Sequence, residues 1–146
     1  MNLLKVVTIG FLILEASNVI VLYFFPGSTY ANGVGVFNAW EKSKRDPEIY
    51  RFVNYLINWV AGTKLIFIVL LIVLLATGDD QQLMLMGAAM ALAIASFFWR
   101  LFPLIRRMDR SNEIQPANYS LVLGGMIFIF IGIFLGAVVA TAVLSP

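Results

Sequence analysis

The sequence predicts an all-α integral membrane protein, an antiparallel bundle of four transmembrane helices. Of the 146 residues, 61% are hydrophobic and 12% are charged, whereas about 25% of the residues in a soluble domain are charged. A soluble fold of this length cannot bury so much apolar surface, so lipid must be the solvent. Four stretches provide the roughly 20 apolar residues that a membrane-spanning helix needs. We therefore expect a single transmembrane domain that comprises residues 1–146.

The first helix is predicted at about residues 3–25, where the sequence Pro-Gly ends it. A long loop follows, and its first part is rich in Gly, Ser and Asn. Its second part, residues 36–42, combines apolar and charged side chains. We expect this piece to form a short interfacial helix that places Phe37 and Trp40 among the lipid headgroups.

The second helix is predicted at about residues 47–77. Asp46 precedes it as an N-cap, and Pro47 occupies the first helical position, where the N–H that proline lacks would have no partner in any case. Gly78 ends the helix. A tight turn over residues 79–80 leads directly into the next helix, so the second and third helices should be antiparallel neighbours.

The third helix is predicted at about residues 81–105 and the fourth at about residues 116–144. Pro103 cannot donate a hydrogen bond to the carbonyl of Trp99, so we expect the third helix to kink or end there. The acidic pair before the third helix has the pattern of a helix cap, and a divalent cation held beside it is the less common alternative.

The basic residues indicate the orientation. Eight of the ten Lys and Arg residues lie in or beside the first and third loops, and positive charge favours the cytoplasmic side. We therefore expect a multi-pass protein of the cell membrane with both of these loops in the cytoplasm and both termini outside it. Every Tyr and Trp lies near the same side, which indicates either a one-sided aromatic anchor or a face that docks a partner. The eight basic residues are Lys42, Lys44, Arg45, Arg51, Arg100, Arg106, Arg107 and Arg110.

Two ionisable side chains fall inside predicted spans, where each costs roughly 3 kcal/mol or more. Counted from the cytoplasmic ends of their helices, Glu15 lies about 15 Å deep and Lys64 about 21 Å deep. Side chains lean toward the N-terminus of their helix, so Lys64 leans toward the level of Glu15. An ion pair between the two is therefore predicted.

Further polar side chains are expected in the same half of the bundle. In one interpretation the group is a structural staple that holds the helices in register. In the other it lines a polar cavity that opens to the cytoplasm, and its surplus of positive charge favours a small anion or an anionic lipid. The candidate ligand-binding residues are Glu15, Asn18, Asn54, Asn58, Lys64 and Arg100.

Two helices carry small residues at four-residue steps, a spacing that allows close helix approach. The third helix has Gly87, Ala91 and Ala95, and the fourth has Gly132, Gly136 and Ala140. Contacts within the bundle and a homodimer through the fourth helix are both consistent with this pattern.

The absence of Cys and His from the sequence excludes disulfides and His- or Cys-ligated metals. We expect no cofactor, no metal and no enzymatic activity, because no catalytic motif is present. A net charge of +2 is too small to indicate nucleic-acid binding. The favoured function is a small transporter, channel or ligand-binding protein. The alternative is a non-catalytic membrane scaffold or accessory subunit that docks a partner on its basic, aromatic cytoplasmic face.

Overall fold

The computed structural model describes residues 3–144, and the regular elements in this part of the chain are all helices. The all-α prediction is therefore confirmed. Four segments are long and apolar enough to cross a membrane, with α4 and α5 together forming one of them. The elements are α1 (Leu3–Phe24), η1 (Val34–Val36), α2 (Asn38–Ser43), α3 (Pro47–Thr77), α4 (Asp80–Ala95), α5 (Phe97–Arg110) and α6 (Tyr119–Leu144).

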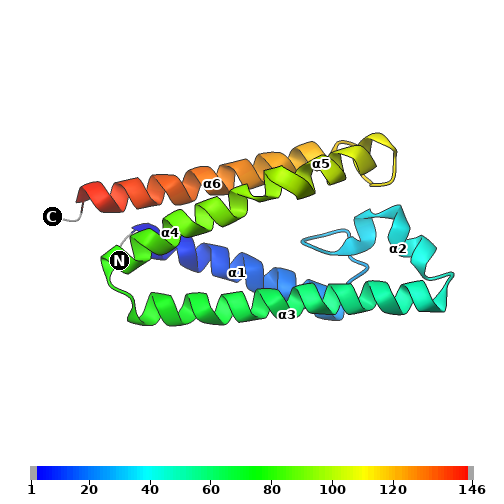
Figure 1. The fold of residues 1–146 in the computed structure, drawn as a ribbon, viewed down its shortest axis with the longest axis horizontal. Helices are drawn as coiled ribbons and strands as arrows, with labels where there is room; N and C mark the ends of the chain where they lie inside the picture. The colour runs from blue at the N-terminus through cyan, green and yellow to red at the C-terminus, as the bar shows by residue number, and fades with distance from the viewer. Residues whose placement is uncertain (1–2, 145–146) are drawn as a thin grey trace.

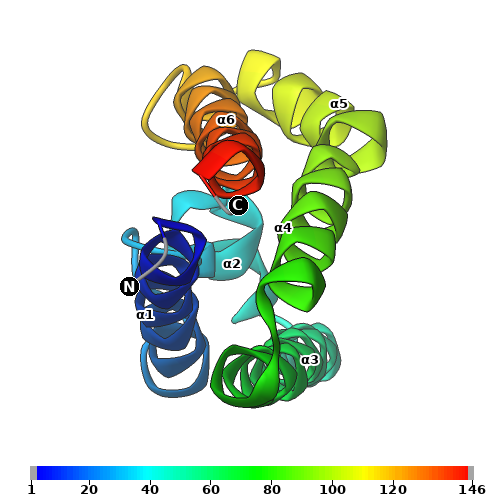
Figure 2. The ribbon, with the colours of Figure 1, turned by 90° about the vertical axis from the view of Figure 1, so that its left-hand side faces the viewer.

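The helices form an elongated bundle with two different ends. Figure 1 shows the start of α1, the α3–α4 turn and the end of α6 at one end, and the two long loops at the other. Helix α1 packs on α3, α4 packs on α6, and α1 also contacts α6. Seen along the bundle in Figure 2, the segment with α2 lies between the helices. We call the end formed by residues 26–51 and 100–118 the basic end.

Small residues let α4 approach its neighbours at the end opposite the basic end. A Cβ atom at Gly87 would lie 2.7 Å from Val138 Cγ2 and 3.0 Å from Leu4 Cδ1, so a side chain there would have to displace these neighbours. Ala91 is also buried, and both belong to the contact of α4 with α1 and α6. The small residues of α4 therefore serve packing within the bundle. The surrounding core consists of Leu4, Leu71, Leu83, Met86, Met90, Phe134 and Ala137.

The predicted helix caps are present. The Asp46 carboxylate accepts hydrogen bonds from the amides of Glu48 and Ile49 at 2.9 and 3.2 Å, and α3 has the predicted bounds. Asp79 forms a capping box with Gln82: its carboxylate accepts from the Gln82 amide, and its own amide donates to Gln82 Oε1. Of the predicted acidic pair, Asp79 is thus the N-cap of α4, as the favoured interpretation required, and Asp80 is the first residue of the helix.

Pro103 does not end the helix, because the helix is interrupted earlier, at Ser96, and then continues through Pro103 to Arg110. The Ser96 hydroxyl donates to the carbonyl of Ala93 at 2.6 Å, and the Ser96 amide approaches the same oxygen at 3.2 Å. This carbonyl is the ordinary partner of the Phe97 amide, so the serine side chain competes with the helix ladder there. Pro103 removes one further hydrogen bond without ending α5.

The fourth helix begins three residues later than predicted, at Tyr119. Residues 116–118 form a turn in which Asn118 has a φ of 65°, a value that lies outside the right-handed helical region. The end of α6 at Leu144 agrees with the prediction.

The first loop folds inward, and the prediction that Trp40 lies among the lipid headgroups is wrong. Trp40 is only 6% exposed and packs with Leu22 of α1 and Ile57 of α3. A Cβ atom at Gly27 would lie 2.8 Å from Trp40 Nε1, so this glycine makes room for the indole ring. Phe37 is also partly buried. A large apolar surface gains more from this contact with α1 and α3 than from a position among headgroups.

Candidate functional sites

The predicted ion pair between α1 and α3 is present. Lys64 Nζ donates to Glu15 Oε2, and Asn18 Nδ2 lies 3.4 Å from Glu15 Oε1. The Glu15 side chain is 15% exposed and that of Lys64 is 25% exposed. Along their helices, Glu15 lies about 18 Å from the start of α1 and Lys64 about 20 Å from the end of α3. Each charge therefore meets its partner at the same level of the bundle.

Aromatic packing bounds this ion pair on one side. Phe11, one turn before Glu15, contacts three other rings edge to face, with centroid distances of 6.3 Å to Phe67, 6.1 Å to Phe130 and 5.4 Å to Phe134. Phe67 follows Lys64 by three residues on α3. The ion pair thus lies within one helical turn of an aromatic cluster, and an unpaired charge in such apolar surroundings is costly.

Three of the six predicted site residues do not join this pair. Asn54 and Asn58 donate their amide hydrogens to backbone carbonyls one turn earlier in α3, both at 2.8 Å, and Asn58 is exposed. Arg100 is exposed on α5 and lies over the ring of Trp99 at 5.8 Å. In the described chain, α5 contacts α4 and α6 but neither α1 nor α3. The prediction that all six residues form one cluster is therefore wrong.

At the basic end, the two long loops bind each other. The Asn38 amide donates to the Glu113 carbonyl at 2.9 Å, and the Gln115 amide donates to the Val36 carbonyl at 2.8 Å. These bonds form an isolated antiparallel bridge between Phe37 and Ile114. Below the bridge, Val36 and Ile114 are buried against Ile105 of α5. The two loops thus fold together over one end of the bundle and are not independent connections.

A buried carboxylate fixes the hairpin between α5 and α6. Asp109 accepts hydrogen bonds from the Asn118 amide at 3.1 Å and the Ser120 amide at 3.0 Å, and from the Ser120 hydroxyl. Arg106 donates to the same hydroxyl at 3.2 Å and lies 3.8 Å from the Asp109 carboxylate. Asp109 therefore caps α6 from a neighbouring helix. Sequence reasoning missed this role, because a carboxylate among arginines resembles an ordinary solvated pair.

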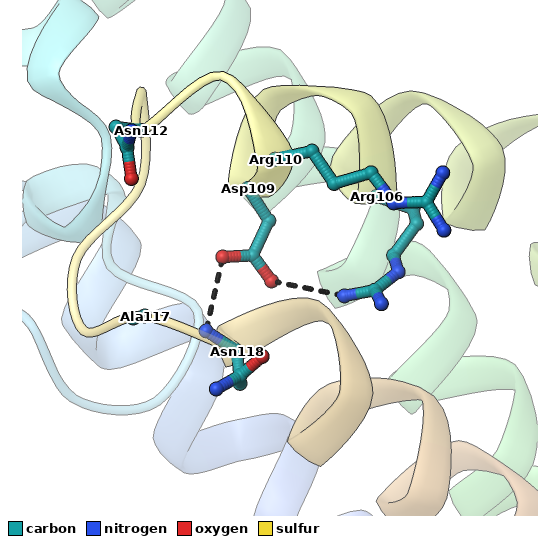
Figure 3. A pocket seen from close by; sticks show the side chains of 6 residues that line it. All are labelled: Arg106, Asp109, Arg110, Asn112, Ala117 and Asn118. Atoms are coloured by element: carbon teal, nitrogen blue, oxygen red, sulfur yellow. Dashed lines mark hydrogen bonds and ion pairs between the residues drawn. The ribbon is translucent and has the colours of Figure 1, made fainter.

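A cavity of about 240 Å³ lies beside this hairpin (Figure 3). Two arginines line it, together with the Asp109 carboxylate and the turn that precedes α6. In Figure 3, the Arg110 side chain extends back along α5 toward Arg106. The lining residues are Arg106, Asp109, Arg110, Asn112, Ala117 and Asn118.

The basic end has a surplus of three positive charges, from eight basic and five acidic side chains. Its carboxylates are partly occupied within the chain: Asp46 and Asp109 cap helices, and Glu41 binds Lys44 at 2.6 Å. Several of its cations are exposed on the surface. An exposed aromatic row on α3 adjoins them, in which neighbouring rings stack at centroid distances of 6.4 Å. The row is Phe52, Tyr55 and Trp59.

Gly132 and Gly136 of α6 do not approach another helix in the described part of the chain. Within 4 Å of a Cβ atom at Gly132 or Gly136 the structure places no atom of another helix or loop, and both residues are exposed. The alternative of packing within the bundle is therefore wrong for these two glycines.

The fold and its sites define a small all-helical chain with four helices of membrane-spanning dimensions, an internal ion pair and one folded basic end. Comparison with known proteins gives no match to a family model, to a curated protein or to a solved structure. The function is therefore argued from the geometry alone.

Proposed function

We propose that the chain is an integral protein of the cell membrane, with four antiparallel spans, both termini outside the cytoplasm and the basic end inside it. The lengths support this arrangement: α1 measures about 33 Å and α6 about 39 Å, and a hydrocarbon core is about 30 Å thick. Helix α3 and the α4–α5 pair each measure about 46 Å. They therefore extend beyond the lipid on one side, where the basic loops lie.

Within the membrane, we propose a non-catalytic scaffold or accessory subunit whose basic end docks an acidic partner protein. One observation carries this proposal: the two basic loops are folded against each other into a defined surface. By contrast, the polar groups in the bundle satisfy one another or their own helix backbone. A pre-ordered surface loses little conformational entropy when it binds a partner.

The charges of the basic end favour an acidic partner. Lys42 and Arg45 on the first loop and Arg51 on α3 are exposed. Cations of this kind accelerate the encounter with an acidic surface and reject basic competitors. The neighbouring aromatic row supplies apolar area of the type that contributes most to binding energy.

The test is the mass of the complex extracted from native membranes in mild detergent, measured by native electrophoresis. We expect the wild-type protein to migrate at a mass well above that of an assembly made only of its own copies. A variant with Lys42→Gln, Arg45→Gln and Arg51→Gln should migrate as that oligomer alone. The matched control is Lys5→Gln, at the opposite end, and it should leave the complex intact. A wild-type protein that already migrates alone contradicts the docking proposal.

A second candidate, a small transporter or channel, is favoured by one observation. The Glu15–Lys64 pair keeps some exposure on both side chains, and intramembrane charges commonly mark a ligand or ion pathway. In this case Glu15, Lys64 and Asn18 would form the ligand site for a small anion. The test is anion flux into proteoliposomes. Flux that depends on Lys64 would favour this candidate over the scaffold.

We also propose a homodimer through α6. The exposed Gly132 and Gly136, with Ala140 one turn further, form a small-residue face that allows a second helix to approach closely. The expected result of changing this face is given in the Discussion.

A further inference from the structure

The cavity beside the α5–α6 hairpin carries cationic groups to which the docking proposal assigns no role. Arg106 and Arg110 lie one turn apart on α5 and line the same space. The charge of Asp109 is already engaged, because its carboxylate accepts three hydrogen bonds from the start of α6. We propose that this cavity binds a phosphate group, held between the guanidinium groups of Arg106 and Arg110.

The size of the cavity fits this ligand. The space of about 240 Å³ opens to the surface, so an anion can enter it. A phosphate group has five heavy atoms and leaves room for an ester substituent. Arginine suits phosphate particularly well, because its planar guanidinium donates two parallel hydrogen bonds to a pair of phosphate oxygens.

The polar environment leaves both arginines able to bind. Arg106 uses one nitrogen for Ser120 and lies 3.8 Å from Asp109, so its position is fixed while its other donors are available. Arg110 is exposed, and its side chain reaches back along α5 (Figure 3). Asp109 opposes an anion on one side of the cavity, but the two cations outnumber it.

In the proposed membrane orientation, the cavity lies at the level of the phosphate groups of the lipid headgroups. Along α4 and α5, Arg106 lies about 39 Å and Arg110 about 45 Å from Asp80. A bilayer with its headgroups is about 40–45 Å thick. With the α3–α4 turn at one surface, both arginines fall at the headgroups of the other. Basic pockets at this level commonly take anionic lipid headgroups, while a free phosphate from the cytoplasm offers the same chemistry.

The face of α5 that bears these arginines supports the same conclusion. Helix α5 is strongly amphipathic, unlike the other long helices. Its inner face packs on α6, its outer face carries the exposed Trp99 and Arg110, and Arg106 lies at the border between the two faces, where it reaches Ser120 of α6. An exposed tryptophan followed by arginines along one face is typical of a helix at the lipid–water boundary.

The test measures binding to the full-length protein in an uncharged detergent, by calorimetry at low salt. The probes are dihexanoyl phosphatidic acid, dihexanoyl phosphatidylcholine and inorganic phosphate. We expect phosphatidic acid to bind, and Arg110→Gln to weaken its binding about tenfold or more, as expected for a lost charge-assisted contact. The matched control is Arg107→Gln, which removes the same charge from an exposed residue outside the cavity and should change the affinity less than about twofold.

Each result decides the proposal. Inorganic phosphate that binds as tightly as phosphatidic acid would support the site and identify a free phosphate as its ligand, whereas a lipid preference of about tenfold would identify the headgroup. Equal losses in Arg107→Gln and Arg110→Gln would show unspecific attraction and overturn the site, as would the absence of binding to any phosphate probe. The Arg110 side chain is exposed and forms no hydrogen bond or ion pair within residues 3–144, so its variant tests binding with little disturbance of the fold. The docking proposal can fail separately, since it depends on Lys42, Arg45 and Arg51, which lie outside the cavity.

Discussion

At the scale of single residues, the low dielectric inside the bundle determines what the polar side chains do. Glu15 and Lys64 are the ionisable groups farthest from both ends of their helices, and they bind each other. Asn54 and Asn58 are nearer the basic end and use their own backbone instead. The sequence predicted the ion pair because helix depth and side-chain lean are local properties. The partners of the asparagines depend on the rotation of α3, which no local pattern fixes.

The first prediction concerns this pair. Glu15→Gln and Lys64→Met should each lower the free energy of unfolding by about 3–5 kcal/mol, because each leaves an unpaired charge in low dielectric. The double variant should be more stable than the sum of the two losses implies. Denaturation in mixed detergent measures all three. Strictly additive losses would show that the two side chains do not interact.

The second prediction separates a buried tryptophan from an exposed one. Trp40→Ala should cost about 3–5 kcal/mol, because it leaves a cavity between α1 and α3. Trp99→Ala is the control: Trp99 is 77% exposed, so the loss should stay near 0.5 kcal/mol. Thermal unfolding in detergent compares them. Similar small losses in both variants would mean that Trp40 lies at the surface, as its sequence alone suggested.

At the scale of helices, the length of the apolar segments and the helix caps could be predicted from the sequence. Features that depend on tertiary contacts could not. The bounds of α3 follow from Asp46 and Pro47 at one end and Gly78 at the other, all of which act within one turn. The break at Ser96 depends on a serine hydroxyl that takes a carbonyl from the helix ladder, a choice that Ser residues make only in some contexts. The inward fold of the first loop depends on a pocket for Trp40 built by two other helices.

The third prediction compares two small-residue helix faces. Gly87→Leu should destabilise the monomer, because Val138 and Leu4 already occupy the space that its side chain needs. Gly132→Leu with Gly136→Leu should leave the monomer folded and weaken the proposed homodimer, because a Cβ atom at either position meets no other element of the described chain within 4 Å. Thermal stability and mass in detergent measure both effects. An unchanged mass after the double change would contradict the dimer through α6.

At the scale of the whole molecule, the chain is asymmetric along its length. One end holds a tight, capped turn with two carboxylates, and the other holds two interlocked loops with a surplus of positive charge. The sequence predicted this asymmetry from the positions of its Lys and Arg residues. It could not predict that the loops bind each other, since the bridge between Phe37 and Ile114 joins segments far apart in the chain. Nor could it predict the cavity, which exists only once Asp109 has joined α5 to α6.

The central claim is that four helices span the membrane with the basic end in the cytoplasm. It is tested most directly by labelling single cysteines with a membrane-impermeant maleimide in intact cells, since the chain has no native cysteine. Suitable positions are Lys42→Cys on the first loop and Gln81→Cys beside the α3–α4 turn, because both side chains are exposed. We predict that Gln81→Cys is labelled at once and that Lys42→Cys is labelled only after permeabilisation. Labelling of Lys42→Cys in intact cells, with Gln81→Cys protected, would show the opposite orientation, and labelling of both would contradict the membrane-spanning arrangement itself.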